Sequence, residues 1–581
     1  MEVVQGREGS FRTRHLQSVI RVAREAQPLA IVTLCVLVAS SVPVVYGYLS
    51  TPSDKWFSGV VYNVHDTAQY FSWMRQSADS VLIENRLTSE PTRAVFFNLH
   101  WWIPGRLAAA ANLSLPQVYQ IFRLLSIPLA TTSLFLFCAR VFEEPKKRRF
   151  SFVLATLTSG LGWIWVVKKY LLQQPDVQFP RDVYTLPGNS FWVMTASPHL
   201  TFALAVTLLT LLLALEGYRR KHWIWSVGAG TTGLFLGMGH IYDLVTVWAV
   251  LGVFGLLVTL RDGWSWDTLW RLAAVILISV PAPLYWGWVA SDANPTWKQA
   301  LSQYDNLGVF TPNPLHMLIL LGLTFILCLA TFDRVVPLRR QPDELLFIKG
   351  WFGITLLLVY LPFRFRITLL TGYQLPIAVL ATIGFLDRVL PWLRRNATNI
   401  TLPGFLAQRE WVEWTPHLFL LAVAATNLYL LAWRVVVLRR YDYPYYLHQD
   451  DLAALRWLEE NTNPDDVVLS SFTIGHYIPG LAGNRPFLSN AVMTMDSHDK
   501  EKMMEAFFDR DTSDAERDVL LRRYGIRYLF HGLAERALGA FEPAQSGLFE
   551  KVYARPQTQV YALRHESHRI GESSSETECS Y

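Results

Sequence analysis

The sequence is poor in charge for its length. Asp, Glu, Lys and Arg make up 17% of the 581 residues, whereas apolar residues make up 51% and aromatic residues 14%. Soluble globular proteins carry about 25% charged residues, so this composition argues against a soluble chain and for a polytopic membrane protein. The net charge is only +5, and the basic residues form short clusters beside apolar segments. This pattern indicates membrane orientation and argues against nucleic acid as a partner.

Cysteine and internal repetition are also scarce. There are four cysteines, of which Cys35, Cys138 and Cys328 fall inside apolar segments and Cys579 lies in the C-terminal tail. Their spacing matches neither a disulfide framework nor a set of metal ligands. The sequence shows no internal repeat of fixed period, although such repeats are common in secondary transporters.

Eleven apolar segments are expected to cross the membrane. They are residues 28–48, 117–142, 152–167, 199–218, 224–238, 244–260, 269–289, 315–332, 345–361, 373–386 and 416–438. The first is too long for the apolar part of a signal peptide, so we expect it to remain as an anchor. Arginines precede it, and Lys146 to Arg149 follow the second segment. The positive-inside rule then predicts a multi-pass protein of the cell membrane with a cytoplasmic N-terminus, although Lys168 and Lys169 oppose this orientation.

The domain boundaries follow from these segments. We expect a cytoplasmic segment at 1–27, a transmembrane domain at 28–440 with a first outer loop at 51–114, and an extracytoplasmic α/β domain at 446–565. In that domain the patterns predict helices at 451–461, 500–509 and 513–524, strands at 467–471 and 526–530, and a hairpin of 549–553 with 559–563. The Ser- and Glu-rich tail, 566–581, is predicted to be disordered.

A helix with a carboxylate follows the first apolar segment. On a helix, Asp66, Tyr70 and Trp73 stand at i, i+4 and i+7 and therefore share a face, with His65 beside them. A carboxylate among aromatic rings suits a group that takes a proton from a hydroxyl while a sugar or a lipid head group packs alongside. An alternative is an amphipathic helix lying in the interface, with Asp66 merely near its N-terminus.

Two arginines mark a second candidate site. Arg364 and Arg366 follow the ninth apolar segment and stand among Pro362, Phe363 and Phe365. Guanidinium groups bind phosphate bidentately, and a lipid phosphate lies at this depth of the membrane. The alternative is simple anchoring, in which both side chains extend towards anionic head groups.

A third group of polar residues interrupts the apolar sequence. His240, Tyr242 and Asp243 form a very short hinge between two segments, and we expect them to face the same outer cavity as Asp66 and to bind sugar or acceptor. A hydrogen-bonded structural turn is the alternative. His199, after Ser197 and Pro198, is a further candidate for substrate binding, and His100, beside Trp101 and Trp102, is a weaker one.

The arrangement resembles the GT-C class of integral membrane glycosyltransferases. The shared features are an acidic residue in the first outer loop, many spans and a C-terminal outer domain. The phrases Leu455 to Thr462 and Leu521 to Tyr528 also resemble the outer domains of bacterial members. The resemblance implies that Asp66 is the catalytic carboxylate and that Arg364 and Arg366 occupy the lipid-phosphate site. Many members have two adjacent acidic residues here, whereas this chain has His65 before Asp66. His65 is expected to orient the Asp66 carboxylate, to relay a proton or to play only a structural part.

The sequence therefore predicts an inverting glycosyltransferase. A sugar would pass from a polyprenyl phosphate to a glycan, lipid or protein acceptor on the outer face of the membrane, and membrane lipids would surround the enzyme. The scheme requires no cofactor, contains no metal-binding residues and leaves a divalent metal open. A transporter or flippase of lipid-linked sugars, and an inactive scaffold of the same fold, are the alternatives. The ionisable residues gather at the outer boundary, which favours chemistry over transport.

Overall fold

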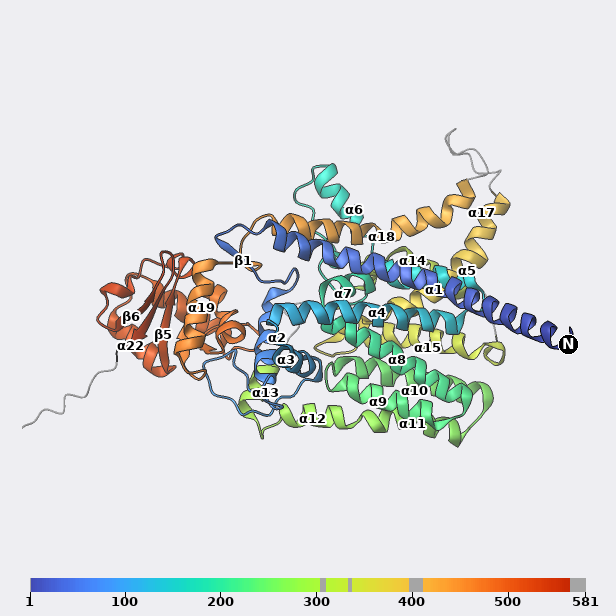
Figure 1. The fold of residues 1–581 in the computed structure, drawn as a ribbon, viewed down its shortest axis with the longest axis horizontal. Coiled ribbons are helices and arrows are strands. Elements are labelled where there is room, and N and C mark those ends of the chain that lie inside the picture. The colour runs from blue at the N-terminus through green and yellow to red at the C-terminus, as the bar shows by residue number, and fades with distance from the viewer. Residues whose placement is uncertain (1, 304–309, 333–336, 397–410, 565–581) are drawn as a thin grey trace, which may run out of the picture. The chain divides into compact units, whose positions relative to one another are not determined.

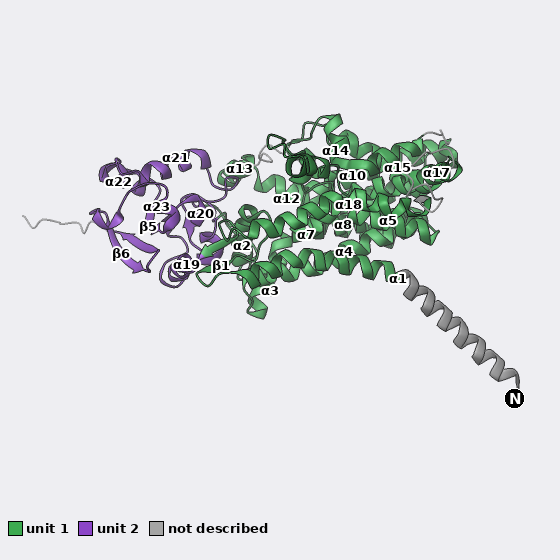
Figure 2. Ribbon diagram, turned by 90° about the horizontal axis from the view of Figure 1, so that it is seen from above, with its two compact units in different colours: residues 1–85, 92–447 green, residues 86–91, 448–581 purple. Residues whose placement is uncertain are grey.

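The computed structural model describes residues 2–303, 310–332, 337–396 and 411–564 (Figure 1). The chain forms two compact units (Figure 2). Unit 1 comprises residues 1–85 and 92–447, and unit 2 comprises residues 86–91 and 448–581. Six residues of the predicted first outer loop, Arg86–Pro91, thus belong to the same compact unit as the C-terminal region.

Unit 1 is a bundle of helices that run largely alongside one another (Figure 1). The helices are α1 (Glu2–Ser50), α2 (Val64–Ser77), α3 (Leu99–Ala111), α4 (Leu115–Val141), α5 (Pro145–Leu157), α6 (Trp163–Val166), α7 (Ser190–Ala196), α8 (Pro198–Arg220), α9 (Trp223–Gly237), α10 (Tyr242–Asp262), α11 (Trp266–Ser279), α12 (Pro281–Val289), α13 (Pro295–Ser302), α14 (Pro314–Leu329), α15 (Asp343–Leu358), α16 (Gln374–Gly384), α17 (Leu390–Asn396) and α18 (Trp411–Leu438), with the short turns η2 (Arg181–Val183), η5 (Arg366–Leu370) and η6 (Phe385–Val389). A short strand, β1 (Lys55–Phe57), follows α1 and pairs with β2 (Tyr446–His448).

Eight helices among the described residues are long and apolar enough to cross a membrane. They are Ala26–Ser50, Leu115–Val141, Pro198–Arg220, Tyr242–Asp262, Trp266–Val289, Pro314–Phe332, Gln374–Asn396 and Val412–Leu438. In the most apolar window of α8, 72% of residues are buried, against 28% for α1 and 22% for α18. Helix α8 therefore lies at the centre of the bundle, whereas α1 and α18 lie on its outside.

The predicted count of eleven spans is not confirmed. The other three predicted segments fall on α5, α9 and α15, which have 13, 15 and 16 residues. The predicted continuous span at 152–167 is wrong, because α5 ends at Leu157 and the chain is irregular until α6 begins at Trp163. The Gly162 N–H donates to Asp182 Oδ2 at 2.6 Å, and a Cβ on Gly160 would lie 2.4 Å from the same oxygen. The close carboxylate therefore requires glycine at both positions and turns the backbone away from a helix.

Unit 2 contains a five-stranded mixed sheet. Its strand order is β4-β3-β5-β7-β6, formed by β3 (Val467–Leu469), β4 (Arg485–Pro486), β5 (Ile526–His531), β6 (Phe549–Ala554) and β7 (Gln559–Leu563). Strands β3, β4 and β5 are parallel, and β7 is antiparallel to both β5 and β6. Helices α19 (Gln449–Asn461), α21 (Ser497–Phe508) and α22 (Asp514–Arg523) confirm the three predicted helices. The predicted strands and the hairpin are confirmed as well, and the predicted tail lies outside the described residues.

The segment 86–91 is held in unit 2 by a buried lysine. The Lys500 side chain is 1% exposed, and its Nζ lies 2.8 Å from both Ser89 Oγ and Glu90 Oε2. The rings of Phe487 and Tyr524, which contact each other edge to face, lie with their centroids 5.4 and 5.3 Å from Nζ. A buried ammonium needs such partners, since an unpaired charge in the interior is very costly.

Candidate active site

Helix α2 begins at a strained residue and places a carboxylate in its first turn. Asn63 precedes it with φ 49° and ψ 50°, and the Asn63 side-chain amide donates to Asp66 Oδ2. Asp66 itself is half-buried, but every residue from Thr67 to Met74 is buried. The helix is therefore part of the interior of unit 1, whereas a helix resting on an interface would leave one polar face open.

Asp66 and a distant arginine both act on Tyr62. Burial raises the pKa of the Tyr62 phenol to about 12, with the nearby charge of Arg434 lowering it and that of Asp66 raising it. The Arg434 guanidinium carbon lies 4.4 Å from the centroid of the Tyr62 ring. Tyr62 is thus flanked by the candidate base and by a cation from α18.

His65 contacts the chain that follows α18. Its Nδ1 lies 3.3 Å from the Tyr443 hydroxyl, and the two rings meet edge to face with centroids 5.8 Å apart. The imidazole is exposed overall, and partial desolvation lowers its pKa below the usual range. It is therefore largely neutral at pH 7 and is able to accept or relay a proton.

The face of α2 that carries Tyr70 enters a cluster of aromatic and histidine rings. Tyr70 stacks on Trp101 of α3 with centroids 4.3 Å apart and an interplanar angle of 12°. Its hydroxyl lies 3.3 Å from His199 Nε2, and His199 Nδ1 lies 3.0 Å from Ser197 Oγ. Because both nitrogens of His199 have partners, the ring orientation is fixed at the start of α8.

The hinge before α10 continues this cluster. The rings of His199 and His240 have centroids 6.2 Å apart, and His240 Nδ1 lies 2.9 Å from Asp243 Oδ2. The Asp243 side chain is 2% exposed, so this contact with the His240 imidazole is buried. The ring of Tyr242 contacts Phe365, with centroids 4.5 Å apart. The structure thus brings Tyr70, His199, His240, Tyr242 and Asp243 into one series of contacts.

The two predicted phosphate-binding arginines bracket Phe365 but differ in their surroundings. Arg364 is exposed, and its Nη1 donates to the Ser302 carbonyl at 2.8 Å. Arg366 begins η5, and its guanidinium carbon lies 5.6 Å from the centroid of the Phe310 ring. The Arg366 Nε is buried and has no hydrogen-bond partner among the described residues. A donor in this state favours an anion that is supplied from outside the chain.

Sequence reasoning missed several residues of this region and underrated another. His100 is 2% exposed, and neither ring nitrogen has a hydrogen-bond partner among the described residues. Burial, with the neighbouring His240, lowers the pKa of His100 to about 3. A Cβ on Gly239 would lie 2.1 Å from the His100 ring, so this glycine admits the imidazole. The sequence did not predict Trp101, Tyr62 or Arg434 as site residues. For Trp101 the reason is that Trp101 beside Trp102 is typical of membrane-interface residues.

The part of the chain that the structure describes contains no cluster of side chains arranged as a metal site. No group of three or more His, Cys, Asp or Glu side chains is arranged to hold an ion there. His100, His199 and His240 are neighbours, but His199 and His240 bond to different partners, and His100 has no hydrogen-bond partner among the described residues. What the region offers is one half-buried carboxylate, several ring faces, imidazole nitrogens and two guanidinium groups. These are the groups that bind a sugar and an anionic leaving group.

Comparison with known proteins places the fold. No family model and no curated protein matches the chain. The apo crystal structure of the oligosaccharyltransferase from Archaeoglobus fulgidus matches with a TM-score of 0.50 and 12% identity, covering 93% of this chain and 75% of that one. The same values hold for AglB from that organism in complex with an inhibitory peptide and a dolichol-phosphate. ArnT from Cupriavidus metallidurans bound to undecaprenyl phosphate matches at 15% identity and a TM-score of 0.46, covering 91% and 98%.

The chain is thus a multi-pass membrane protein with a GT-C-like fold, as the arrangement of the sequence predicts. At 12% identity the likeness concerns the fold, and the chemistry must be argued from the residues of this chain.

Proposed function

We propose that the protein is an inverting glycosyltransferase that moves a sugar from a polyprenyl phosphate to an acceptor hydroxyl on the outer face of the membrane. The observation that carries this proposal is the placement of Asp66. It stands at the start of a buried helix whose next turn, Tyr70, enters the cluster of His199 and His240. The cluster in turn reaches Phe365, between the two arginines.

The reaction is a single displacement. The Asp66 carboxylate takes the proton of the acceptor hydroxyl as its oxygen attacks the anomeric carbon. The bond between this carbon and the phosphate oxygen breaks, and the lipid phosphate leaves with the electron pair. Arg364 and Arg366 balance the charge that develops on the phosphate. Attack from the face opposite the leaving group inverts the anomeric configuration.

The remaining residues have supporting roles in this scheme. The faces of Tyr70 and Tyr242 pack against the sugar, while His199 and the His240–Asp243 pair bind its hydroxyl groups. His65, held by Tyr443, orients the first turn of α2 and with it Asp66. The capture of A. fulgidus AglB with a dolichol-phosphate supports a lipid phosphate as the leaving group here.

A transfer assay tests the proposal. The purified full-length protein in vesicles is incubated with radiolabelled polyprenyl-phosphate sugars and a membrane extract, with and without EDTA. Covalent transfer of label, with inverted configuration in the product, supports the proposal. Movement of labelled lipid across the vesicle membrane without transfer would identify a flippase, and inertness in both assays an inactive scaffold. The EDTA arm decides whether a divalent metal is needed.

A further inference from the structure

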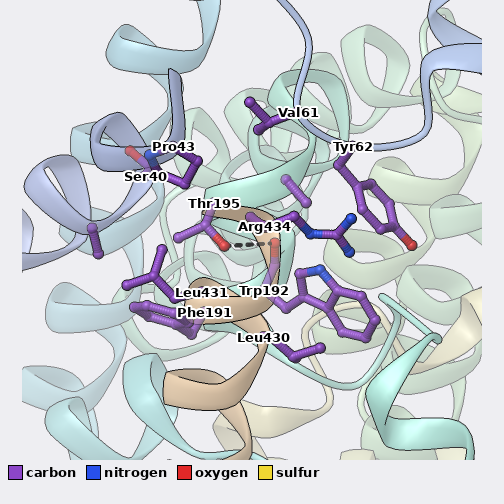
Figure 3. A pocket seen from close by; sticks show the side chains of 12 residues that line it. Ser40, Pro43, Val61, Tyr62, Phe191, Trp192, Thr195, Leu430, Leu431 and Arg434 are labelled. Atoms are coloured by element: carbon purple, nitrogen blue, oxygen red, sulfur yellow. Dashed lines mark hydrogen bonds between the residues drawn. The ribbon is translucent and has the colours of Figure 1, made fainter. Parts of the chain in front are cut away.

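An apolar groove lies between the two outermost spans and α7. It is lined by Ala39, Ser40 and Pro43 of α1, by Val61 and Tyr62, by Phe191, Trp192, Thr195 and Ala196 of α7, and by Leu430, Leu431 and Arg434 of α18 (Figure 3). Of its hydroxyls, Ser40 Oγ donates to the Leu37 carbonyl at 3.0 Å and accepts from Arg123 Nη1, Thr195 Oγ1 donates to the Trp192 carbonyl at 3.2 Å, and Tyr62 adds a phenol. The lining therefore offers mostly hydrocarbon to a ligand.

The position of the groove favours a lipid chain. Helices α1 and α18 have the least buried windows of the eight candidate spans, together with that of Trp266–Val289, so this part of unit 1 faces the membrane. The lining residues of α18 lie four to eight residues before its end, Leu438, and those of α1 lie seven to eleven residues before its end, Ser50. The groove thus extends from about the middle of the first span towards one boundary of the membrane, and Arg434 lies at the end nearest that boundary, where the first carbons of a lipid chain meet its head group.

Arg434 supplies a free charge at the end of the groove. Figure 3 shows its guanidinium directed towards the Tyr62 ring. It makes no hydrogen bond and no ion pair with any residue in the described ranges. A cation–π contact with Tyr62 uses none of the guanidinium N–H groups as hydrogen-bond donors, so these remain available to an anion. A planar fork of donors beside an apolar groove at a membrane boundary selects a phosphate that bears a hydrocarbon chain.

The same place is within reach of Asp66. Tyr62, over which Arg434 lies, precedes Asp66 by four residues, and both charges act on its phenol. A head group whose phosphate is bound by Arg434 would therefore hold its own hydroxyl near the candidate base. Arg364 and Arg366, by contrast, lie beyond the cluster of Tyr70, His199 and His240, next to Tyr242.

We propose that this groove binds the acceptor, and that the acceptor is a membrane lipid whose head group carries both a phosphate and a free hydroxyl. The hydrocarbon chain lies among Pro43, Phe191 and Leu431, and Arg434 holds the phosphate. The acceptor role rests on the proposed function, whereas the binding of such a lipid does not depend on it. The groove is then separate from the site of the donor phosphate at Arg364 and Arg366.

Lipid selectivity provides the test. The full-length protein is reconstituted in vesicles of phosphatidylcholine with a trace of spin-labelled phosphatidylglycerol, whose head group has a phosphate and free hydroxyls. We expect an immobilised fraction for the wild type. Arg434→Gln removes the charge and Leu431→Trp fills the groove, so each should weaken the binding about tenfold or more. Arg440→Gln, an exposed arginine just beyond the same helix, is the matched control and should bind as the wild type does.

The outcomes separate the two proposals. Unchanged immobilisation in both Arg434→Gln and Leu431→Trp would overturn the groove as a lipid site. An equal loss in Arg440→Gln would reduce Arg434 to general attraction of anionic lipids and overturn it too. Selective binding, with transfer of sugar to other acceptors but never to the bound lipid, would overturn the acceptor role alone. Selective binding in a protein that transfers no sugar at all would leave the lipid site standing and refute the proposed function. Arg434→Lys keeps the charge without the planar fork and should therefore bind the lipid only partly. Because it does not fill the groove, it tests the site even if the tryptophan variant fails to fold.

Discussion

Asp66→Asn tests the proposed base directly. The amide keeps the shape of the side chain and its contact with Asn63, but it has no proton-accepting carboxylate. General-base assistance is worth about 100-fold to 10,000-fold, so turnover should fall by at least the lower figure while donor binding persists. Transfer rate and donor affinity are measured in one detergent. Asp54→Asn, an exposed carboxylate of the same loop, serves as the control. Near-normal turnover in Asp66→Asn would remove Asp66 from the mechanism.

Replacement of Arg364 or of Arg366 should weaken use of the donor in the same way. Alanine at Arg364 or at Arg366 removes a charged donor to the lipid phosphate, which is worth about 1.5 to 3 kcal/mol. The Michaelis constant for the donor should rise accordingly, and lysine should restore it poorly because it lacks the planar fork. Arg339→Ala, an exposed arginine elsewhere in unit 1, should leave donor use unchanged. If both alanine variants use the donor normally, the two residues serve as membrane anchors.

The residues of the candidate site were only partly predictable. The helical period was enough to place Asp66, Tyr70 and Trp73 on one face, since it depends on local geometry. The stacking of Tyr70 on Trp101 depends on how α2 and α3 pack, which no local pattern encodes. Arg434 falls inside the predicted last span, and only its contact with the Tyr62 ring distinguishes it.

At the scale of elements, the same contrast appears between local and distant contacts. Helix α22 was predicted closely because Ser513 and Glu516 form a capping box and mark its start. The break between α5 and α6 was missed, since it depends on Asp182, twenty residues further on. Its carboxylate is buried, which raises its pKa to about 7, and the Gly162 N–H opposes that shift. Hydropathy does not register such a contact, and the segment was interpreted as a span.

The segment 86–91 gives a prediction about stability and pH. Burial alone would raise the pKa of Glu90, but Lys500 and the hydrogen bonds from Lys500 and Thr88 lower it below its usual range. The folded state therefore binds this proton less readily than the unfolded state. The stabilisation from the pair is present above the unfolded pKa of about 4.3 and is lost as the pH falls through the lower pKa of the folded state.

Glu90→Gln should remove this stabilisation at neutral pH. It leaves the Lys500 ammonium buried without its counter-charge, which costs about 3 kcal/mol, the lower end of the range for a broken buried pair because Glu90 is partly exposed. Hydrogen exchange of the amides in 86–91, followed at pH 7 and at low pH in the full-length protein, measures the loss. Glu550→Gln, an exposed carboxylate in β6, is the control. Equal protection of this segment in Glu90→Gln and wild type would refute the role of the pair.

At the scale of the whole molecule, composition was the most informative signal. The apolar segments and the change in composition after residue 446 predicted a membrane bundle with a separate α/β region. Lipid requires apolar helices, whereas water permits a mixed sheet with polar residues, so composition alone separates the two regions. A fold shared with A. fulgidus AglB at 12% identity is consistent with that, since many apolar sequences satisfy the same bundle. The membership of 86–91 in unit 2 was not predictable, since its partner Lys500 lies 410 residues from Glu90 and 412 from Thr88.

The last prediction concerns the side of the membrane on which the chemistry takes place. Basic residues gather at one end of unit 1: Arg140 at the end of α4 pairs with Glu216, Arg219 with Glu344, and Lys147 with Asp387. The N-terminal end of α4 lies beside α2, where the rings of Tyr119 and Phe71 meet edge to face. Helix α4 has 27 residues and is therefore about 40 Å long, enough to cross a membrane. The basic end and Asp66 thus lie at opposite ends of a helix long enough to cross the membrane, and the positive-inside rule predicts that Asp66 lies outside.

Reporter fusions after Arg149 and after Leu563 test this orientation. The first fusion should report the cytoplasm and the second the outside, because the basic cluster at Lys146 to Arg149 is retained inside while unit 2 follows a span that leads outwards. A cysteine placed at Asp54, in the same loop as Asp66, should react with a membrane-impermeant reagent added to whole cells, whereas one placed at Arg149 should react only after lysis. Reporters in the same compartment would overturn the predicted side of unit 2. A protected residue 54 would move Asp66 to the cytoplasmic face, where the sugar donor would have to be presented from inside the cell.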